Sequence, residues 1–476
     1  MERSQDKSGF LDANSTYYRF VVLLFNCMLT FGSYFCFDMP SVLQDTFTGT
    51  FGYNCTTDNS TNVRTCEEHL GLSETQYGLL YSVYAWMNAL VVIGSGLLID
   101  KFGQRVGALL FSALCVIGSS IFAAGYFFKN GNAMFPVFLF GRLLFGAGNG
   151  SLTIAQNRIS AFWFDGKELA FAFGLTLAFS RLGSILNFLL TENFVAKYGL
   201  KWTLWGGALL CALGFLSAIL LYYLDKNGTK QLNKEEDMKQ ASKKMRLGDI
   251  KYLKLQFWLL VIITMFFYNT VFTFMANAKK FIEQNYGYDQ DSKTPAYIAG
   301  SVYDVSLFFT PIFGILVDYM GYRGVVATIC ASLSIPVFAF LAFTHYTPLI
   351  GTILLGATYS AAACSLWPSA PLVVNPGVLG TALGLMTSVQ MIGIGCCTLI
   401  VGAILDHTND NWKYVMLFLF ANAVACVLFS ILLNIVDWKR GGVLNKTRKR
   451  AKKHRPVTEE IPDTDALISD ENSVNT

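Results

Sequence analysis

Charged side chains inside long apolar stretches are the residues of this sequence best suited to bind a ligand. Arg181 stands near the middle of the apolar stretch 168–191, with Ser184 and Asn187 beside it. A charge inside a membrane costs roughly 2.5–3.5 kcal/mol on insertion scales, so a charge that is kept faces a cavity or a partner. An arginine in that position is suited to grip a carboxylate. The alternative, which the sequence leaves open, is a structural ion pair with a carboxylate on another helix.

Two carboxylates stand at comparable depths in other apolar stretches. Asp38 lies near the end of 19–43, two residues before Pro40, and Asp304 lies in 296–317. Asp38 is interpreted as a proton site, as a site for a substrate amine, or as a side chain that hydrogen-bonds the backbone loosened by Pro40. Asp304 is a second candidate for the amine. The sequence does not decide between these interpretations.

Uncharged polar residues indicate a lining for the same site. In the stretch 134–157, Arg142, Gly146, Asn149, Thr153 and Gln156 are spaced by 4, 3, 4 and 3 residues, which places them on one helical stripe. Arg142 is either part of a cavity wall or a cap for backbone carbonyls near the membrane surface. The predicted substrate-binding set is Arg181, Asp38, Asn149, Gln156, Asn157, Asn187, Tyr268, Asn269, Asp304, Trp367 and Gln390. Trp367 precedes Pro368 and is interpreted as a gate, a hinge or an interfacial anchor.

Twelve apolar stretches must position these residues. The chain has 476 residues, of which 14% are charged, whereas about 25% is usual in soluble domains. Stretches of about 20 apolar residues cross a bilayer. We place them at 19–43, 75–98, 106–128, 134–157, 168–191, 202–224, 255–277, 296–317, 325–344, 347–370, 379–404 and 412–436. The sequence therefore predicts an all-α membrane protein, with the lipid bilayer as one of its partners.

A ten-residue pattern occurs twice, 218 residues apart. Gly96–Arg105 and Gly314–Arg323 share the pattern G-x-L-x-D-x-x-G-x-R, and each copy follows the second apolar stretch of its half. The glycines allow close approach of two helices, and the charged residues can lock or release a helix end. The predicted gating residues are Gly96, Asp100, Arg105, Gly314, Asp318 and Arg323. The pattern resembles the signature loop of the major facilitator superfamily of secondary transporters.

This resemblance implies twelve transmembrane helices in two pseudo-symmetric six-helix bundles around a central cavity. The expected units are a tail at 1–18, bundles at 19–224 and 255–437, a linker at 225–254 and a tail at 438–476. Lys and Arg cluster in alternate loops, in the linker and in the second tail, so both termini and the linker are expected on the cytoplasmic side. Lys279 and Lys280, beyond the end of 255–277, are interpreted as interfacial residues rather than functional ones.

The loop after the first apolar stretch carries signs of the oxidising, non-cytoplasmic side. It contains the sequons of Asn54 and Asn59, which are predicted glycosylation sites, and two cysteines, Cys55 and Cys66. We predict a disulfide between these cysteines, because paired cysteines and glycans both belong on that side of the membrane. The sequons of Asn14, Asn227 and Asn445 fall on the cytoplasmic side and are expected to be unmodified.

Further blocks resemble one branch of the superfamily, the lysosomal dipeptide uniporters. They are FGSYFCFDMPSVL at 31–43, the segment 151–184, YSAAACSLWP at 359–368 and GTALG at 380–384. This resemblance implies uniport of dipeptides, in which Arg181 holds the C-terminal carboxylate of the peptide. Gly150 stands where the relatives carry an acidic residue that binds the substrate amine. Asp304 is an acidic residue that the relatives lack, and it could bind the amine from the opposite wall of the cavity. The relatives' N-terminal sorting motif is missing, and Asp463, Leu467 and Ile468 form a D-x-x-x-L-I candidate instead.

The predicted function is secondary transport of dipeptides across the lysosomal membrane by alternating access, with the plasma membrane as the alternative location. Two other functions stay open: a proton-coupled carrier of another organic anion or amino acid, and a sensor or scaffold that does not transport. A glycosylated accessory membrane protein and a second copy of the chain are further partners to test, and nucleic acid is not expected. The sequence holds no metal-ligand cluster, phosphate-binding loop, redox motif or nucleophile with a paired base, so we expect no enzyme, cofactor or metal.

Overall fold

The computed structural model describes residues 13, 15–49, 52–57, 64–129, 131–164, 169–232, 253–288, 292–344, 346–374 and 379–445. For residues 16, 52–57, 64–68, 96, 97, 100, 101, 169–171, 318 and 379–381 the description is confined to the backbone. Eleven helices in these ranges are long and apolar enough to cross a membrane.

The first half of the chain folds into long helices that match the predicted stretches. They are α1 (Thr16–Val42), α3 (Glu74–Phe102), α4 (Gln104–Gly125), α5 (Met134–Trp163) and α6 (Leu169–Gln231), with a short α2 (Gln44–Thr48) and the 3₁₀ turn η1 (Tyr126–Phe128). At about 1.5 Å per residue, α6 is far longer than one bilayer crossing. Its backbone breaks at Gly199, where φ is 80°. This glycine separates two crossings, so the eleven long helices make twelve crossings.

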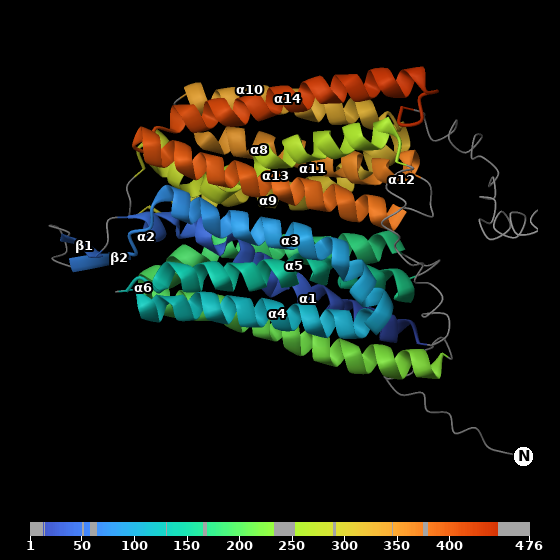
Figure 1. Cartoon of the computed structure of the whole chain (residues 1–476), viewed down its shortest axis with the longest axis horizontal. Helices are drawn as coiled ribbons and strands as arrows, with labels where there is room; N and C mark the ends of the chain where they lie inside the picture. The colour runs from blue at the N-terminus through green and yellow to red at the C-terminus, as the bar shows by residue number, and fades with distance from the viewer. Residues whose placement is uncertain are drawn as a thin grey trace, which may run out of the picture.

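The second half repeats the arrangement. Its helices are α8 (Leu255–Tyr286), α9 (Thr294–Met320), α10 (Arg323–Phe343), α11 (Pro348–Leu366), α12 (Ala370–Val373), α13 (Leu379–Thr408) and α14 (Trp412–Lys439), with the 3₁₀ turn η3 (Trp367–Ser369) between α11 and α12. Pro368 removes a backbone donor inside η3, which explains why the helix is interrupted there. In Figure 1 the helices α1 to α6 form the lower group and the helices α8 to α14 form the upper group.

Each group has its own apolar core. One core cluster is built almost wholly from residues of α1 to α6, and the other almost wholly from residues of α8 to α14, with Val42, Ile185 and Phe188 added from the first half. The predicted fold of two six-helix bundles is confirmed. Below, the N-bundle means α1 to α6, and the C-bundle means α8 to α14.

A feature that the sequence analysis did not predict is a small β-hairpin after α1. Strands β1 (Gly52–Thr57) and β2 (Arg64–His69) pair antiparallel, with Cys55 directly opposite Cys66. Figure 1 shows the hairpin at one end of the helices, while α1 begins at the other. We call these the hairpin end and the terminal end.

The two copies of the repeated decapeptide adopt the same kind of turn at the terminal end. Gly103 (φ 87°) separates α3 from α4, and Gly321 (φ 75°) with Tyr322 (φ 47°) separates α9 from α10. Side-chain-bearing residues rarely adopt positive φ, which favours glycine at both positions. Both copies of the repeat therefore place a glycine with positive φ at the end of a helix.

Candidate functional site

Arg181 lies in α6 at the interface between the bundles and is 7% exposed. Its guanidinium donates a hydrogen bond to the Ser306 hydroxyl of α9 and lies 4.7 Å from the centre of the Tyr359 ring of α11. Among the described side chains no carboxylate lies within ion-pair distance of it. The structural ion pair that the sequence left open is therefore not present there, and the cation is held by a neutral hydroxyl and an aromatic face.

Asp38 lies in α1 on the same interface and is 3% exposed. One carboxylate oxygen accepts a hydrogen bond from the Tyr303 hydroxyl of α9 at 3.1 Å, and the other has no partner among the described side chains. The carbonyl that Pro40 leaves without a helical donor is that of Cys36, four residues earlier, and the Arg142 guanidinium donates to it at 3.3 Å. The Asp38 carboxylate is therefore not used to satisfy this backbone.

Further buried polar atoms without a partner lie on α5, α6, α8 and α13. Within the described side chains, the buried atoms without a hydrogen-bond partner include Asn149 Oδ1, Asn269 Oδ1, Gln390 Oε1, Asn187 Nδ2 and Arg181 Nε. An unsatisfied buried polar atom costs about 1–3 kcal/mol. The oxygens among them are acceptors that N–H donors could pair with, and Arg181 is a cation that an anionic group could pair with.

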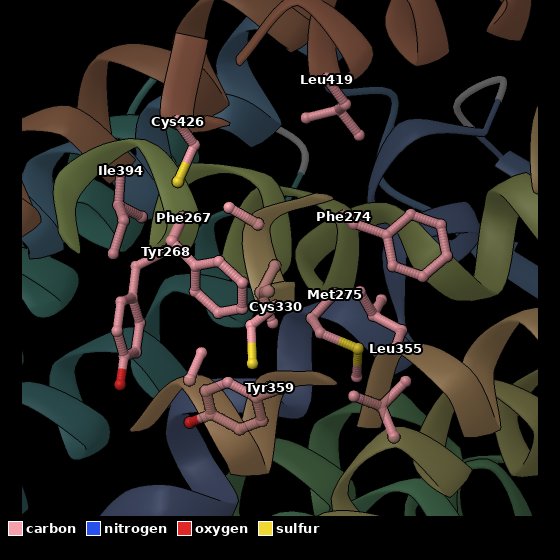
Figure 2. Close-up of a cluster of buried hydrophobic side chains, with 14 of the residues drawn as sticks. Phe267, Tyr268, Phe274, Met275, Cys330, Leu355, Tyr359, Ile394, Leu419 and Cys426 are labelled. Atoms are coloured by element: carbon pink, nitrogen blue, oxygen red, sulfur yellow. The ribbon is translucent and has the colours of Figure 1, made fainter. Parts of the chain in front are cut away.

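Aromatic rings form the wall of the C-bundle next to Arg181. The Trp367 indole N–H donates to the Tyr268 hydroxyl at 2.7 Å, and the Tyr268 and Tyr359 ring centres are 5.9 Å apart. Figure 2 shows the hydroxyl ends of Tyr268 and Tyr359 at the same side of the buried apolar cluster. Trp367 thus links the interrupted helix at η3 to this wall, a contact that an interfacial anchor would not make.

Three residues of the predicted set lie apart from this arrangement. Gln156 is committed to α1, because its Nε2 donates to the Asn26 carbonyl at 2.7 Å and to the Thr30 hydroxyl at 3.0 Å. Asn157 is exposed. Asp304 is half-buried and has no described polar partner, and Phe308, one turn further along the same face, is 72% exposed.

Arg142 makes the contacts of a cap rather than of a cavity wall. Its guanidinium donates to the backbone carbonyls of Cys36 and Phe37 at 3.3 and 3.2 Å, within the α1 segment that precedes Pro40. The Tyr81 and Phe145 rings lie within 6 Å of its central carbon. Of the two interpretations of this arginine, the structure favours the capping one.

The signature loops at the terminal end are held by contacts inside each bundle. Arg105 forms an ion pair with Asp225 of α6, and the Trp163 indole N–H donates to the other oxygen of that carboxylate at 2.6 Å. Arg323 donates to the Pro368 carbonyl at 2.6 Å. A Cβ on Gly314 would lie 3.9 Å from the nearest side chain, the Cys364 sulfur. The surroundings of Gly96 and the side chains of Asp100 and Asp318 lie outside the described part.

Among the described residues, a group of buried charges that the sequence analysis missed lies at the hairpin end. Lys279 and Lys280 are 7% and 4% exposed, so their interpretation as interfacial residues is wrong. Lys279 lies 3.3 Å from Asp45, 3.2 Å from Glu192 and 3.8 Å from Glu283, and Lys280 lies 2.5 Å from Glu74 and 2.9 Å from Asp410. We call these seven residues the hairpin-end ion network.

This network joins the two bundles. Asp45, Glu74 and Glu192 belong to the N-bundle, whereas both lysines belong to α8 of the C-bundle. Nearby, the Asp406 carboxylate of α13 accepts from the backbone N–H groups of Glu74 and Thr75 at 2.8 and 2.7 Å. Buried ion pairs with additional hydrogen bonds are costly to break. The bundles are therefore locked together at the hairpin end in this structure.

The remaining predicted sites fall where side chains are not described. Asn54, Cys55 and Cys66 lie in the hairpin, and Asn59, Asp463, Leu467 and Ile468 lie outside the described residues. Asn445, whose sequon was expected to be unmodified, uses its side chain inside the protein: it donates to Asn434 at 2.7 Å and accepts from the Val325 backbone at 3.1 Å.

Two six-helix bundles with a buried charged site between them define a secondary transporter fold. The chain belongs to the major facilitator superfamily, whose family model matches residues 23–396. It is 35% identical over 451 residues to the human lysosomal dipeptide transporter MFSD1, covering 92% of this chain and 90% of that protein. The zebrafish (Danio rerio) lysosomal dipeptide transporter MFSD1 is 32% identical over 460 residues, with 94% and 93% covered.

Solved structures agree on the fold. The nucleoside transporter NupG superimposes with a TM-score of 0.63 at 14% identity, covering 87% of this chain and 99% of that one. The xylose transporter XylE from E. coli, in a partially occluded inward-open conformation, gives a TM-score of 0.62 at 13% identity, with 89% and 99% covered.

Proposed function

We propose that this protein carries dipeptides across the lysosomal membrane by alternating access. The observation that carries the proposal is the pairing of a buried, carboxylate-free Arg181 with a buried Asp38 that keeps one oxygen unpaired, both at the bundle interface. A zwitterion offers the anionic and cationic groups that such a site requires. The names of the similar vertebrate transporters supply the substrate class and the organelle.

In this proposal the peptide carboxylate binds Arg181 and the peptide amine binds Asp38. Asp304, the other candidate for the amine, lies on a helix face that continues into exposed Phe308 and Ile315, so we favour Asp38. Asn149, Asn269 and Gln390 offer acceptors for N–H groups of the peptide main chain. Because these contacts are made to main-chain groups, the site discriminates little between substrate side chains. We therefore expect a broad range of dipeptides to be transported.

The hairpin end is proposed to face the lumen, because it carries the sequons and the cysteine pair. The hairpin-end ion network then closes the luminal side, and the terminal end, where α1 begins and α14 ends, faces the cytoplasm. Rocking of one bundle against the other would open the luminal side as the signature loops of Arg105 and Arg323 close the cytoplasmic side. A glycosylated accessory protein and a sorting role for Asp463, Leu467 and Ile468 remain proposals from the resemblance.

Flux into proteoliposomes tests the function. We expect saturable uptake of a panel of dipeptides, with little uptake of free amino acids, and no loss of uptake when a protonophore is added. Uptake that collapses with the protonophore would identify a proton-coupled carrier that uses Asp38 as its proton site. Binding of dipeptides without any flux would identify a sensor and refute transport.

The hairpin geometry supports the proposed disulfide. Cys55 and Cys66 are partners in the antiparallel register, and directly opposite residues have Cα atoms about 4.5–5.5 Å apart, within the range that a disulfide spans. We expect mass spectrometry of the unreduced protein to find one peptide pair joined through these cysteines. The Cys55→Ser variant should gain one free thiol, at Cys66. A free-thiol count unchanged by reduction of the wild-type protein would refute the bond.

A further inference from the structure

One face of α9 contacts both proposed substrate-binding charges. Tyr303 donates to the Asp38 carboxylate at 3.1 Å, and Ser306, three residues later, accepts a hydrogen bond from the Arg181 guanidinium. Residues three apart on a helix share a face. Asp38 and Arg181 belong to the N-bundle, whereas α9 belongs to the C-bundle. Two neutral hydroxyl groups of one bundle therefore hold the two charges of the other.

These contacts are buried on both sides. Tyr303 and Ser306 are 4% and 0% exposed, and the Tyr303 ring packs against Phe188 of α6 with ring centres 5.9 Å apart. The Ser184 hydroxyl is another neighbour of the Asp38 carboxylate, but it belongs to α6 and moves with the N-bundle. The Tyr303 and Ser306 contacts are thus the described hydrogen bonds that give each charge a partner across the interface.

Uniport makes a particular demand on such charges. After releasing its substrate, a uniporter must return to its starting conformation without a ligand. During this return the binding site closes, and its charged side chains are buried without the ligand groups that paired with them. A charge buried in a low-dielectric site without a hydrogen-bonding partner is strongly disfavoured. An empty carrier therefore needs internal groups that take the ligand's place, and neutral hydroxyls suit this role because the ligand can displace them.

We propose that Tyr303 and Ser306 are positioning residues that replace the substrate on Asp38 and Arg181 in the empty carrier and so permit its return. This inference rests on the proposed dipeptide transport and adds how the unloaded protein moves. In the loaded carrier the peptide amine and carboxylate satisfy the two charges. Loss of either hydroxyl should then slow the return of the empty carrier and leave the loaded step almost unchanged.

Comparison of net flux with exchange tests the inference. Reconstituted wild type, Tyr303→Phe and Ser306→Ala are assayed for net efflux of a labelled dipeptide into peptide-free buffer. The same proteins are assayed for exchange, with the same dipeptide saturating on both sides. We expect net flux to fall roughly ten- to a hundred-fold in each variant, because a hydrogen bond to a charged group is lost. Exchange should stay within about two-fold of wild type, with KM unchanged.

Tyr297→Phe is the matched control, since it removes a hydroxyl from the same helix where Tyr297 contacts Asn193 at 3.1 Å rather than a buried charge. It should change neither assay. Equal losses of net flux and exchange, a raised KM for exchange, or no change at all would overturn the inference. Ser306→Ala tests it independently if Tyr303→Phe does not fold. If the wild type shows neither flux nor exchange, the proposed function itself is refuted.

Discussion

Arg181→Ala is expected to lower dipeptide flux strongly. The guanidinium is buried at the bundle interface and has no described carboxylate partner, so the peptide carboxylate is its proposed counter-ion. Truncating one member of a buried hydrogen-bonded charge pair typically costs 2–5 kcal/mol or more. At 1.4 kcal/mol per factor of ten, kcat/KM should fall about 30-fold or more. Uptake of a labelled dipeptide into proteoliposomes measures the change.

Two further variants show whether the charge acts on the substrate. Arg181→Lys keeps a cation but loses the planar fork that binds a carboxylate through two bonds, so it should restore only part of the flux. Arg440→Ala removes an exposed arginine at the terminal end and should transport like the wild type. A dipeptide with an amidated C-terminus should be a poor substrate of the wild type. Equal transport of amidated and free peptides would contradict the assignment of Arg181 to the carboxylate.

The helices could be predicted from the sequence because apolar length decides them. A bilayer crossing needs about 20 apolar residues, and the predicted start of the stretch 255–277 coincides with the first residue of α8. The far end of α8 was placed nine residues too early, because Lys279, Lys280 and Glu283 are polar and resemble the end of a span. The structure shows why these residues remain helical: their charges are paired inside the protein with partners that were not visible in the local sequence.

The candidate site could be predicted only in part, for a related reason. Arg181 and Asp38 could be singled out because they lie inside apolar stretches, where a charge raises the free energy of membrane insertion. Their actual contacts, Ser306 and Tyr303, lie 125 and 265 residues away in the chain, and no local spacing indicates such pairs. Asp304 was predicted as a site residue on the same ground, but its position along an apolar stretch does not show which side of the helix faces the other bundle. Phe308 and Ile315 on its side of α9 are exposed, whereas Asp38 and Arg181 are buried.

Lys280→Ala is expected to open the hairpin end. Lys280 is the described cation that joins Glu74 of the N-bundle to Asp410 of the C-bundle, and its removal leaves Glu74 buried without that partner. Breaking a buried ion pair costs 3–5 kcal/mol, so the equilibrium should shift about 100-fold or more toward the state that is open at the hairpin end. A cysteine at Asn277, which is 6% exposed and lies across the bundle interface from Gln44, reports the opening.

The measurement is the rate at which a membrane-impermeant maleimide labels Asn277→Cys from the hairpin side, with the same protein lacking this cysteine as the blank. Labelling should be slow in the Asn277→Cys background and at least ten-fold faster when Lys280→Ala is added. Lys413→Ala, which removes an exposed lysine at the same end, should leave the rate unchanged. Lys280→Arg keeps a cation between Glu74 and Asp410 and should keep labelling slow. Slow labelling in Lys280→Ala, or fast labelling in Lys280→Arg, would show that the ion network does not hold the hairpin end closed.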